Sequence, residues 1–226
     1  PVIAVVGYTN AGKSTLFNTL TSAGVLAENK LFATLDPVTR QVTLPGSQQV
    51  LFTDTVGFIQ KLPTKLIAAF HATLEEVVDA DLLLEVVDAS HEMASEQNET
   101  VNAILDDLGA NDKPRVTALN KIDLLPDPSV VDTSFYPNAV PISALNRSGL
   151  DELLEKIAAV LAESMEYIQV LIPFHKSELV ELFHRRGYVE QEVHDANGTC
   201  ISGRIPRSLH SYYQPFVHTQ SEEHQK

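Results

Sequence analysis

The sequence predicts an α/β fold, in which helices cover both faces of a mostly parallel β-sheet, followed by a small α+β domain. Short apolar runs rich in β-branched residues and leucine have the length of buried parallel strands. These runs lie at 2–6, 50–53, 82–87 and 116–119. Most are separated by segments of helical periodicity, and after residue 165 the character of the chain changes. We therefore expect a domain over 1–165 and a second over 166–226.

The composition is that of a globular protein of 226 residues, 44% of them hydrophobic. A net charge of -14 argues against non-specific binding to nucleic acids or anionic membranes, although a local patch could still dock. The single cysteine, Cys200, excludes an intrachain disulfide and suits a reducing compartment, so we expect a cytoplasmic protein. The sequence shows no signal peptide or membrane-length apolar run. Because a core strand follows Pro1 at once, we expect that an upstream part of the protein is missing.

The first strand leads into a segment that matches the phosphate-binding pattern G-x-x-x-x-G-K-[ST], and a helix is expected over 13–22. Gly7 and Gly12 permit turns that a Cβ would obstruct, so backbone N–H groups can surround the α- and β-phosphates. Lys13 can reach the β- and γ-phosphates, and the Ser14 hydroxyl can bind Mg²⁺. A glycine-rich turn with a surface lysine is the alternative, which the flanking strand and helix disfavour. The predicted nucleotide-binding residues of this loop are Gly7, Tyr8, Thr9, Asn10, Ala11, Gly12, Lys13, Ser14 and Thr15.

A polar segment over 27–40, interrupted by Pro37, follows the first helix and is predicted to be a loop. A nucleotide switch needs a segment of this kind that carries a hydroxyl for Mg²⁺ and the γ-phosphate. Thr34 is the first candidate for that hydroxyl and Thr39 the second. Alone, the segment would be interpreted as a plain surface loop; its position after a phosphate loop favours the switch.

A strand over 40–44 and a turn lead to the second buried strand, which ends at Asp54. A carboxylate at the carboxyl end of a parallel strand faces the ligand crevice. There Asp54 can hold the Mg²⁺ shell as a Walker-B residue. Gly57 then allows its own N–H to approach the γ-phosphate. The alternative for Asp54 is a residue that only forms the turn after the strand.

In the middle of the chain, the pattern predicts a helix over 63–78, followed by the third core strand at 82–87. A second helix is expected over 95–108, ended by Gly109, and the fourth core strand follows at 116–119. That strand runs into Asn120-Lys121-Ile122-Asp123. A carboxylate can accept from guanine N1–H and the N2 amine, whereas adenine offers no such pair of donors. Asp123 is placed for this recognition, and it would reject the wrong base if it were buried and left unpaired. Asn120 would brace the loop, and the Lys121 stem would lie along the base. The alternative is a turn that starts a helix.

A short strand over 139–142 precedes Ser143-Ala144-Leu145, whose backbone N–H groups could bind guanine O6. This motif is the least specific, and a bare loop remains an open alternative. An amphipathic helix over 149–162 closes the first domain.

The second domain is predicted as strand, helix, strand, strand, a β-α-β-β order with a frayed tail from His218. Its elements are expected at 168–173, 176–186, 187–194 and 199–205. The spacings of His175, His184, His194 and His210 match no metal-binding motif, so structural or surface roles are favoured. Arginines could form a local basic patch, with scattered solvated charges as the default. They are Arg185, Arg186, Arg204 and Arg207.

Taken in this order, the motifs resemble those of the translation-factor class of P-loop GTPases. The stretches 32–40 and 54–63, with Thr73-Leu-Glu-Glu76, look like the HflX family of ribosome-associated GTPases. The resemblance covers the first domain, and the second is similar to the domain that HflX proteins carry after it. It implies a P-loop NTPase G domain that binds GTP and GDP with Mg²⁺. It also implies binding to the large ribosomal subunit, both rRNA and ribosomal proteins, and splitting of ribosomes under stress. Such contacts would run mainly through an N-terminal domain that this sequence lacks.

Lys13, Thr34 and Gly57 are the residues expected to act on the γ-phosphate. Phe58 follows Gly57 where many GTPases have a glutamine, and phenylalanine cannot orient water, so we expect slow intrinsic hydrolysis that the ribosome accelerates. Asn10 resembles an asparagine with which some P-loop GTPases coordinate K⁺. Two alternatives stay open: a module that binds GTP with negligible hydrolysis, and a P-loop kinase for a small molecule, which would not need to read guanine.

Overall fold

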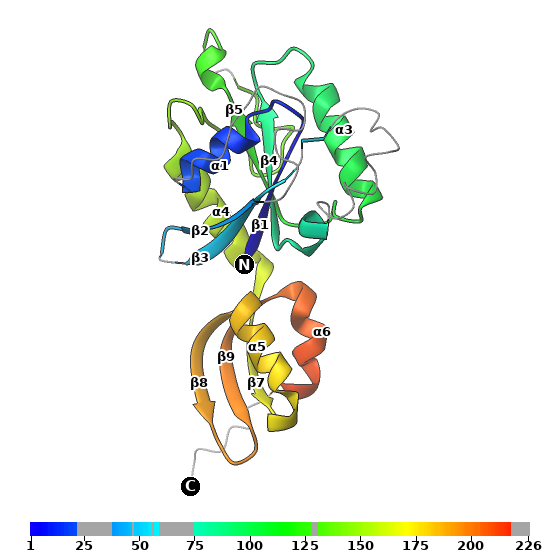
Figure 1. Ribbon diagram of the computed structural model, residues 1–226, viewed down its shortest axis with the longest axis vertical. Coiled ribbons are helices and arrows are strands. Elements are labelled where there is room, and N and C mark those ends of the chain that lie inside the picture. The colour runs from blue at the N-terminus through cyan, green and yellow to red at the C-terminus, as the bar shows by residue number, and fades with distance from the viewer. Residues whose placement is uncertain (22–37, 47, 56, 59–74, 128–130, 218–226) are drawn as a thin grey trace. The chain divides into compact units, whose positions relative to one another are not determined.

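The computed structural model describes residues 1–21, 38–46, 48–55, 57–58, 75–127 and 131–217 (Figure 1). The chain divides into two compact units, Val2–Leu161 and Ala162–Lys226 with Pro1. The domain boundary that we placed between residues 165 and 166 remains a prediction. None of the helices in the described residues combines the length and apolar character that crossing a bilayer requires.

Within the described residues, six strands of the first unit form one sheet in the order β2-β3-β1-β4-β5-β6. Neighbouring strands are parallel except β2 and β3, so the predicted mostly parallel sheet is confirmed. The strands are β1 (Val2–Val6), β2 (Val38–Thr43), β3 (Gln49–Asp54), β4 (Leu82–Asp88), β5 (Arg115–Asn120) and β6 (Val140–Pro141).

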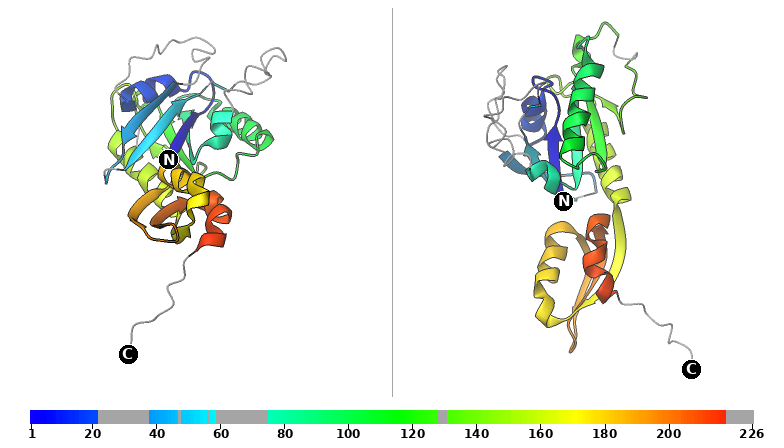
Figure 2. Two further views of the ribbon diagram at one scale, coloured as in Figure 1. Left: turned by 60° about the horizontal axis from the view of Figure 1, so that its bottom comes forward. Right: turned by 90° about the vertical axis from the view of Figure 1, so that its right-hand side faces the viewer.

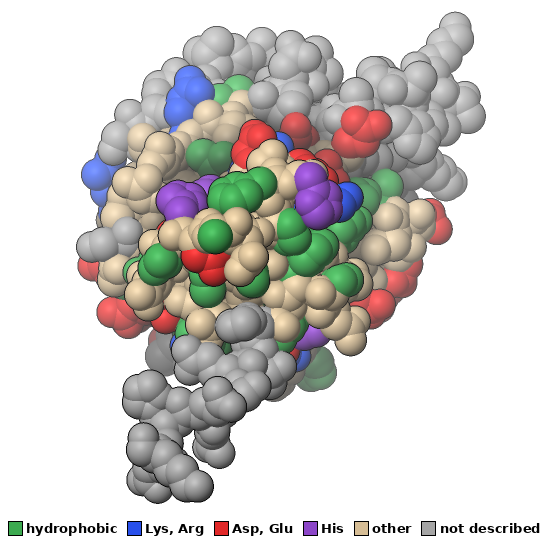
Figure 3. Space-filling model, turned by 90° about the horizontal axis from the view of Figure 1, so that it is seen from below, with side chains coloured by type: hydrophobic (Ala, Val, Ile, Leu, Met, Phe, Trp, Pro, Cys, Tyr) green, Lys and Arg blue, Asp and Glu red, His purple; other side chains and the backbone are tan. Residues whose placement is uncertain are grey.

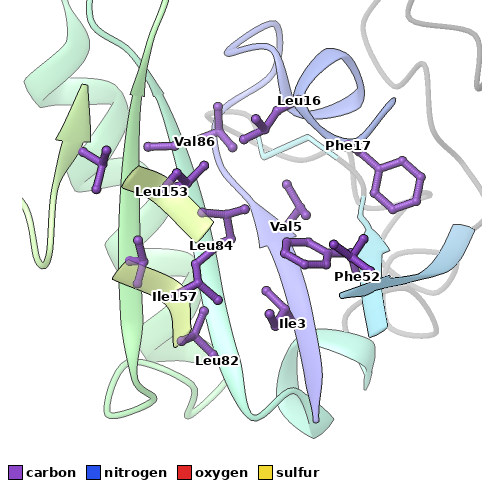
Figure 4. Packing of buried hydrophobic residues seen from close by; sticks show 14 of the residues in the cluster. Ile3, Val5, Leu16, Phe17, Phe52, Leu82, Leu84, Val86, Leu153 and Ile157 are labelled. Atoms are coloured by element: carbon purple, nitrogen blue, oxygen red, sulfur yellow. The ribbon is translucent and has the colours of Figure 1, made fainter. Parts of the chain in front are cut away.

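Helices cover both faces of this sheet, as predicted (Figure 2). Helices α1 (Lys13–Thr21) and α4 (Leu150–Ser164) pack on the face to which Ile3 and Val5 point (Figure 4). Helix α3 (Ala94–Asp107) covers the other face. Since both faces are covered, every residue of the central strand β4 is buried, and its sequence is apolar except for Glu85, which is paired with Arg115, and Asp88 at its end.

Several element ends differ from the prediction by a few residues. Strand β2 starts at Val38 instead of residue 40, because it pairs with β3 from Val38 opposite Asp54 to Thr43 opposite Gln49. Strand β6 is shorter than predicted, since only Val140 and Pro141 pair with β5. Gly109 has a φ of 64°, the left-handed conformation that ends helices such as α3.

The second unit contains an antiparallel sheet in the order β7-β9-β8, counted over the described residues. Its elements are β7 (Met165–Ile172), α5 (Ser177–Arg186), β8 (Tyr188–His194), β9 (Thr199–Pro206) and α6 (His210–Tyr213). The β-α-β-β order is as predicted, but α6 was not, because a four-residue helix has no periodicity to detect. Tertiary contacts hold it: the Tyr213 ring packs edge-to-face on Phe183 and its hydroxyl donates to the Leu179 carbonyl at 2.8 Å.

The described histidines of the second unit, His175, His184, His194 and His210, lie in different elements. Figure 3 shows histidine side chains at the molecular surface, and His184 and His210 lie within 3.0 Å of the carboxylates of Glu192 and Glu166. Within the described part of the chain, no group of three or more His, Cys, Asp or Glu residues is arranged to hold a metal ion. Structural or surface roles for these histidines remain a prediction.

Candidate nucleotide-binding site

The loop between β1 and α1 depends on its two glycines. Gly7 and Gly12 have φ angles of 143° and 101°, which residues with a Cβ rarely adopt. A Cβ on Gly7 would collide with the carbonyl oxygen of Val86, and a Cβ on Gly12 would collide with the side-chain nitrogen of Asn120. The loop therefore lies directly against β4 and the end of β5, where only backbone fits.

The Lys13 side chain points into this loop. Its ammonium donates to the carbonyl oxygens of Gly7 at 3.0 Å and Tyr8 at 2.9 Å, and the residue is only 6% exposed. Burial lowers the pKa of Lys13 to about 8, and the negative charge of Asp54 opposes this effect. A phosphate oxygen would therefore meet a poorly solvated cation that already lies inside the loop, where its electrostatic effect is strongest.

Two oxygen-bearing side chains meet beside Lys13. The Ser14 hydroxyl, in the first turn of α1, donates to Asp54 Oδ2 at 2.9 Å. Asp54 ends β3 and is fully buried. Hydroxyl and carboxylate oxygens are the donors that Mg²⁺ prefers, so this pair fits the metal that the sequence predicts.

The chain after β3 is hydrogen-bonded to the phosphate loop. Thr9 N–H donates to the Phe58 carbonyl at 2.8 Å, and Phe58 N–H donates to the Gly7 carbonyl at 3.1 Å. The Phe58 side chain is fully buried in the core with Ala4. It is therefore packed among apolar side chains and carries no group that could orient water.

Gly57 lies close to the buried lysine. A Cβ on Gly57 would approach Lys13 Nζ and Thr9 Cα to 3.0 Å, tighter than almost all real contacts. A side chain at position 57 would therefore require Lys13 or Thr9 to shift. Of the two candidate switch threonines, Thr34 lies outside the described residues. Thr39 lies in β2, where its hydroxyl is 3.0 Å from that of Thr53.

Asn120 is hydrogen-bonded to two loops, whereas the sequence predicted that it braces one. Its side chain is buried; Nδ2 donates to the Ala11 carbonyl at 2.9 Å, and Oδ1 accepts from Ala144 N–H at 3.0 Å. One amide group therefore connects the phosphate loop to the 143–145 motif.

The next residue, Lys121, has a left-handed φ of 67°. Its ammonium donates to the Asn10 carbonyl at 2.8 Å and lies 2.6 Å from Asp88 Oδ2. Sequence reasoning missed Asp88. The available signal was its position at the carboxyl end of a parallel strand, the same signal that identified Asp54.

Asp123 lies in a short 3₁₀ helix, Ile122–Leu124, and is exposed. The carboxylate is accessible to a base. Discrimination against adenine requires a buried, unpaired carboxylate, so the bound base would itself have to cover Asp123.

The 143–145 motif differs in part from the prediction. Ser143 N–H donates to the Ser148 carbonyl at 3.1 Å, and Ala144 N–H already donates to Asn120. Both residues are buried, whereas Leu145 is 75% exposed. Binding of guanine O6 would therefore need an exchange of partners at Ala144, or the N–H of Leu145.

The other predicted loop residues are Tyr8, Asn10, Ala11 and Thr15. Tyr8 is bridged to Phe58, and Ala11 is buried in the core. Thr15 lies in the first turn of α1, where its carbonyl accepts from the Thr19 hydroxyl at 2.8 Å. Asn10 is exposed and has a left-handed φ of 61°.

Residues 2–121, more than half of the chain, match a family model described as "50S ribosome-binding GTPase". A GTPase HflX from Caldanaerobacter subterraneus subsp. tengcongensis is 44% identical over 96% of this chain and 50% of its own length. GTPase HflX from Escherichia coli is 39% identical over 91% of this chain and 49% of its own length. The chain thus spans about half the length of the curated relatives that it matches.

Solved structures with the same fold bind guanine nucleotides. A GTP-binding protein from Sulfolobus solfataricus in complex with GDP is 30% identical, with a TM-score of 0.58 over 72% of this chain and 53% of that one. A point variant of Era from Aquifex aeolicus, bound to GDP·AlF₄⁻, is 27% identical, with a TM-score of 0.61 over 70% of this chain and 56% of that one.

Proposed function

The chain belongs to the family of 50S ribosome-binding GTPases, among the HflX GTPases, and from this premise we propose that it binds GTP and GDP and hydrolyses GTP. The observation that carries the proposal is that the guanine motif is hydrogen-bonded both to the phosphate loop and to the 143–145 motif. Asn120 and Lys121, from the guanine motif, are hydrogen-bonded to carbonyls of the phosphate loop at Ala11 and Asn10. The predicted base site and phosphate site therefore share one framework, as a guanine nucleotide requires.

The mechanism that fits this framework is in-line attack of water on the γ-phosphate. The Lys13 ammonium exchanges its loop carbonyls for β- and γ-phosphate oxygens and offsets the charge that develops on them. Mg²⁺, when bound, would neutralise the same oxygens as a Lewis acid. Ser14 and the switch hydroxyl of Thr34 would hold the metal, with Asp54 orienting its shell. The N–H of Gly57 senses the γ-phosphate.

We further propose that the whole protein acts as a switch on the large ribosomal subunit and splits ribosomes under stress. Loss of the γ-phosphate would release the segments that contain Thr34 and Gly57, which is the usual way such switches change state. The family description and the HflX relatives support this role. Contacts with rRNA and ribosomal proteins would come mainly from the part of the relatives that this chain does not cover.

A GTP-binding module with negligible hydrolysis is the second candidate, because the buried Phe58 ring leaves no side chain at that position to orient water. The two candidates differ in whether the ribosome accelerates turnover. K⁺ bound near Asn10 would supply a positive charge and raise turnover by itself. Equal rates in K⁺ and Na⁺ would exclude that role.

The decisive experiment measures turnover of GTP and of ATP by this chain, with and without 50S subunits, in K⁺ and in Na⁺. We expect GTP-selective turnover that is slow alone. Acceleration by 50S subunits would support the switch and place a docking surface within these residues. GTP binding without acceleration would leave ribosome recognition to the rest of the protein. Equal use of ATP would contradict the proposal.

A further inference from the structure

The carboxylate of Asp88, which belongs to none of the nucleotide motifs, is the centre of a line of polar contacts beside the guanine site. Asp88 ends β4 and is 8% exposed. Its Oδ2 lies 2.6 Å from Lys121 Nζ, and its Oδ1 accepts from Ser90 Oγ at 2.6 Å and Ser90 N–H at 3.1 Å. Because Lys121 Nζ also donates to the Asn10 carbonyl at 2.8 Å, one lysine side chain connects β4 to the phosphate loop.

The Lys121 side chain needs such an anchor. Four rotatable bonds give a lysine many conformations, and its left-handed backbone conformation is unfavourable for a residue with a Cβ. Its stem can lie along a base only if the ammonium is held at a fixed place. The Asn10 carbonyl supplies one neutral acceptor, and Asp88 supplies the charged one, which makes the stronger hydrogen bond.

The Asp88 carboxylate is suited to this task because it is ionised. Burial alone would raise the pKa of Asp88, but hydrogen bonds from Lys121 and Ser90 lower it below its usual value. The two contacts with Ser90 fix the orientation of the carboxylate, so Oδ2 faces Lys121.

We propose that Asp88 is a positioning residue for guanine recognition, which acts by fixing the Lys121 side chain before a nucleotide binds. The inference rests on the proposed function, since it concerns the base site of that same nucleotide. The competing explanation is that Asp88 only stabilises its own turn with Ser90.

Asp132 provides a matched control for that turn. Its Oδ1 accepts from Ser134 N–H at 2.9 Å and Ser134 Oγ at 2.6 Å, the same Asp-x-Ser arrangement, but it is fully exposed and, among the described residues, forms no ion pair with Lys121. Asp88→Asn keeps the Oδ1 acceptor and removes the charge that faces Lys121. We expect Asp88→Asn to weaken GDP and GTP binding by the same factor, about tenfold, the scale of one lost charge-assisted bond. Asp132→Asn should leave both affinities within about twofold of wild type.

The test is a double-mutant cycle with Lys121→Met, which keeps the stem and removes the ammonium. Dissociation constants of the nucleotide-free full chain are measured with a fluorescent GDP analogue and by competition with unlabelled GDP. Thermal melting followed by circular dichroism checks that each variant is folded. If Asp88 acts through Lys121, Asp88→Asn has no further effect in the Lys121→Met background.

Equal losses in both backgrounds would overturn the positioning role and favour the local turn, as would an unchanged affinity in Asp88→Asn alone. A wild-type chain that binds no guanine nucleotide would overturn the proposed function and the positioning role together. The two failures are therefore distinguishable in one set of titrations.

Discussion

Replacing Asn120 by alanine should destabilise the nucleotide-free chain by about 2–4 kcal/mol. The buried amide makes two hydrogen bonds, to the Ala11 carbonyl at 2.9 Å and from Ala144 N–H at 3.0 Å. The truncation leaves both backbone groups buried without these partners, and each such loss costs about 1–3 kcal/mol. Entry of a water molecule into the space would bring the sum toward the lower end. Since whole domains are stable by only about 5–15 kcal/mol, the loss is large enough to measure accurately.

The assay is urea unfolding of the chain in EDTA, followed by far-ultraviolet circular dichroism, with the slope m compared between variants. Gln41→Ala is the control. That amide is exposed and donates a single bond, to the exposed side-chain oxygen of Gln49, so its loss should cost less than about 1 kcal/mol. The reasoning would be refuted if Asn120→Ala lost no more stability than Gln41→Ala at unchanged m.

Three further predictions concern the nucleotide itself and the buried lysine. Lys13→Met should abolish GTP binding in a titration. The same variant should also stabilise the nucleotide-free chain in EDTA. Burying the charged Lys13 costs folding free energy, and this cost is fully present below about pH 8. It disappears as the pH rises toward 10.5, the pKa of the lysine in the unfolded chain, so the stabilisation by Lys13→Met must shrink over that range. A pH-independent difference in unfolding free energy would contradict this. Gly57→Ala should reduce single-turnover GTP hydrolysis by at least about tenfold, because the Cβ crowds the Thr9 backbone and displaces the Gly57 N–H from the γ-phosphate. GDP has no γ-phosphate, so GDP affinity should stay near wild type. Asp123→Asn should shift preference from guanosine to xanthosine nucleotides, since the amide can donate to xanthine O2; unchanged guanine selectivity in competition assays would exclude Asp123 as the base reader.

The sequence was sufficient to predict the parts of the fold that depend on local pattern. Buried strands such as β1 have uninterrupted apolar sequences because helices cover both faces of the sheet, and Gly109 marks a helix end by its left-handed conformation. The order of motifs likewise predicted that Asn120 braces a loop, but not that its amide joins the phosphate loop to the 143–145 motif. Parts that depend on contacts between distant residues could not be predicted. The Asp88–Lys121 pair spans 33 positions, and α6 is a single turn held by packing on Phe183.

The 143–145 motif shows the same division between local pattern and distant contact. Its sequence indicated backbone N–H groups that could face a base, but not that Asn120, 24 positions earlier, already accepts from Ala144. For Phe58, the residue type alone excluded the orientation of water. Only the fold showed that its ring lies in the core between the sheet and α3.

The tight contact between Gly12 and Asn120 also restricts how this site can change by mutation. Any side chain at position 12 would occupy the place of the Asn120 amide nitrogen, and that amide already joins two loops. A substitution at position 12 would be tolerated sterically only if position 120 had first become smaller, and that first step already removes both bonds. A substitution at either position alone is therefore expected to destabilise the site, and a change at position 12 depends on the residue at position 120.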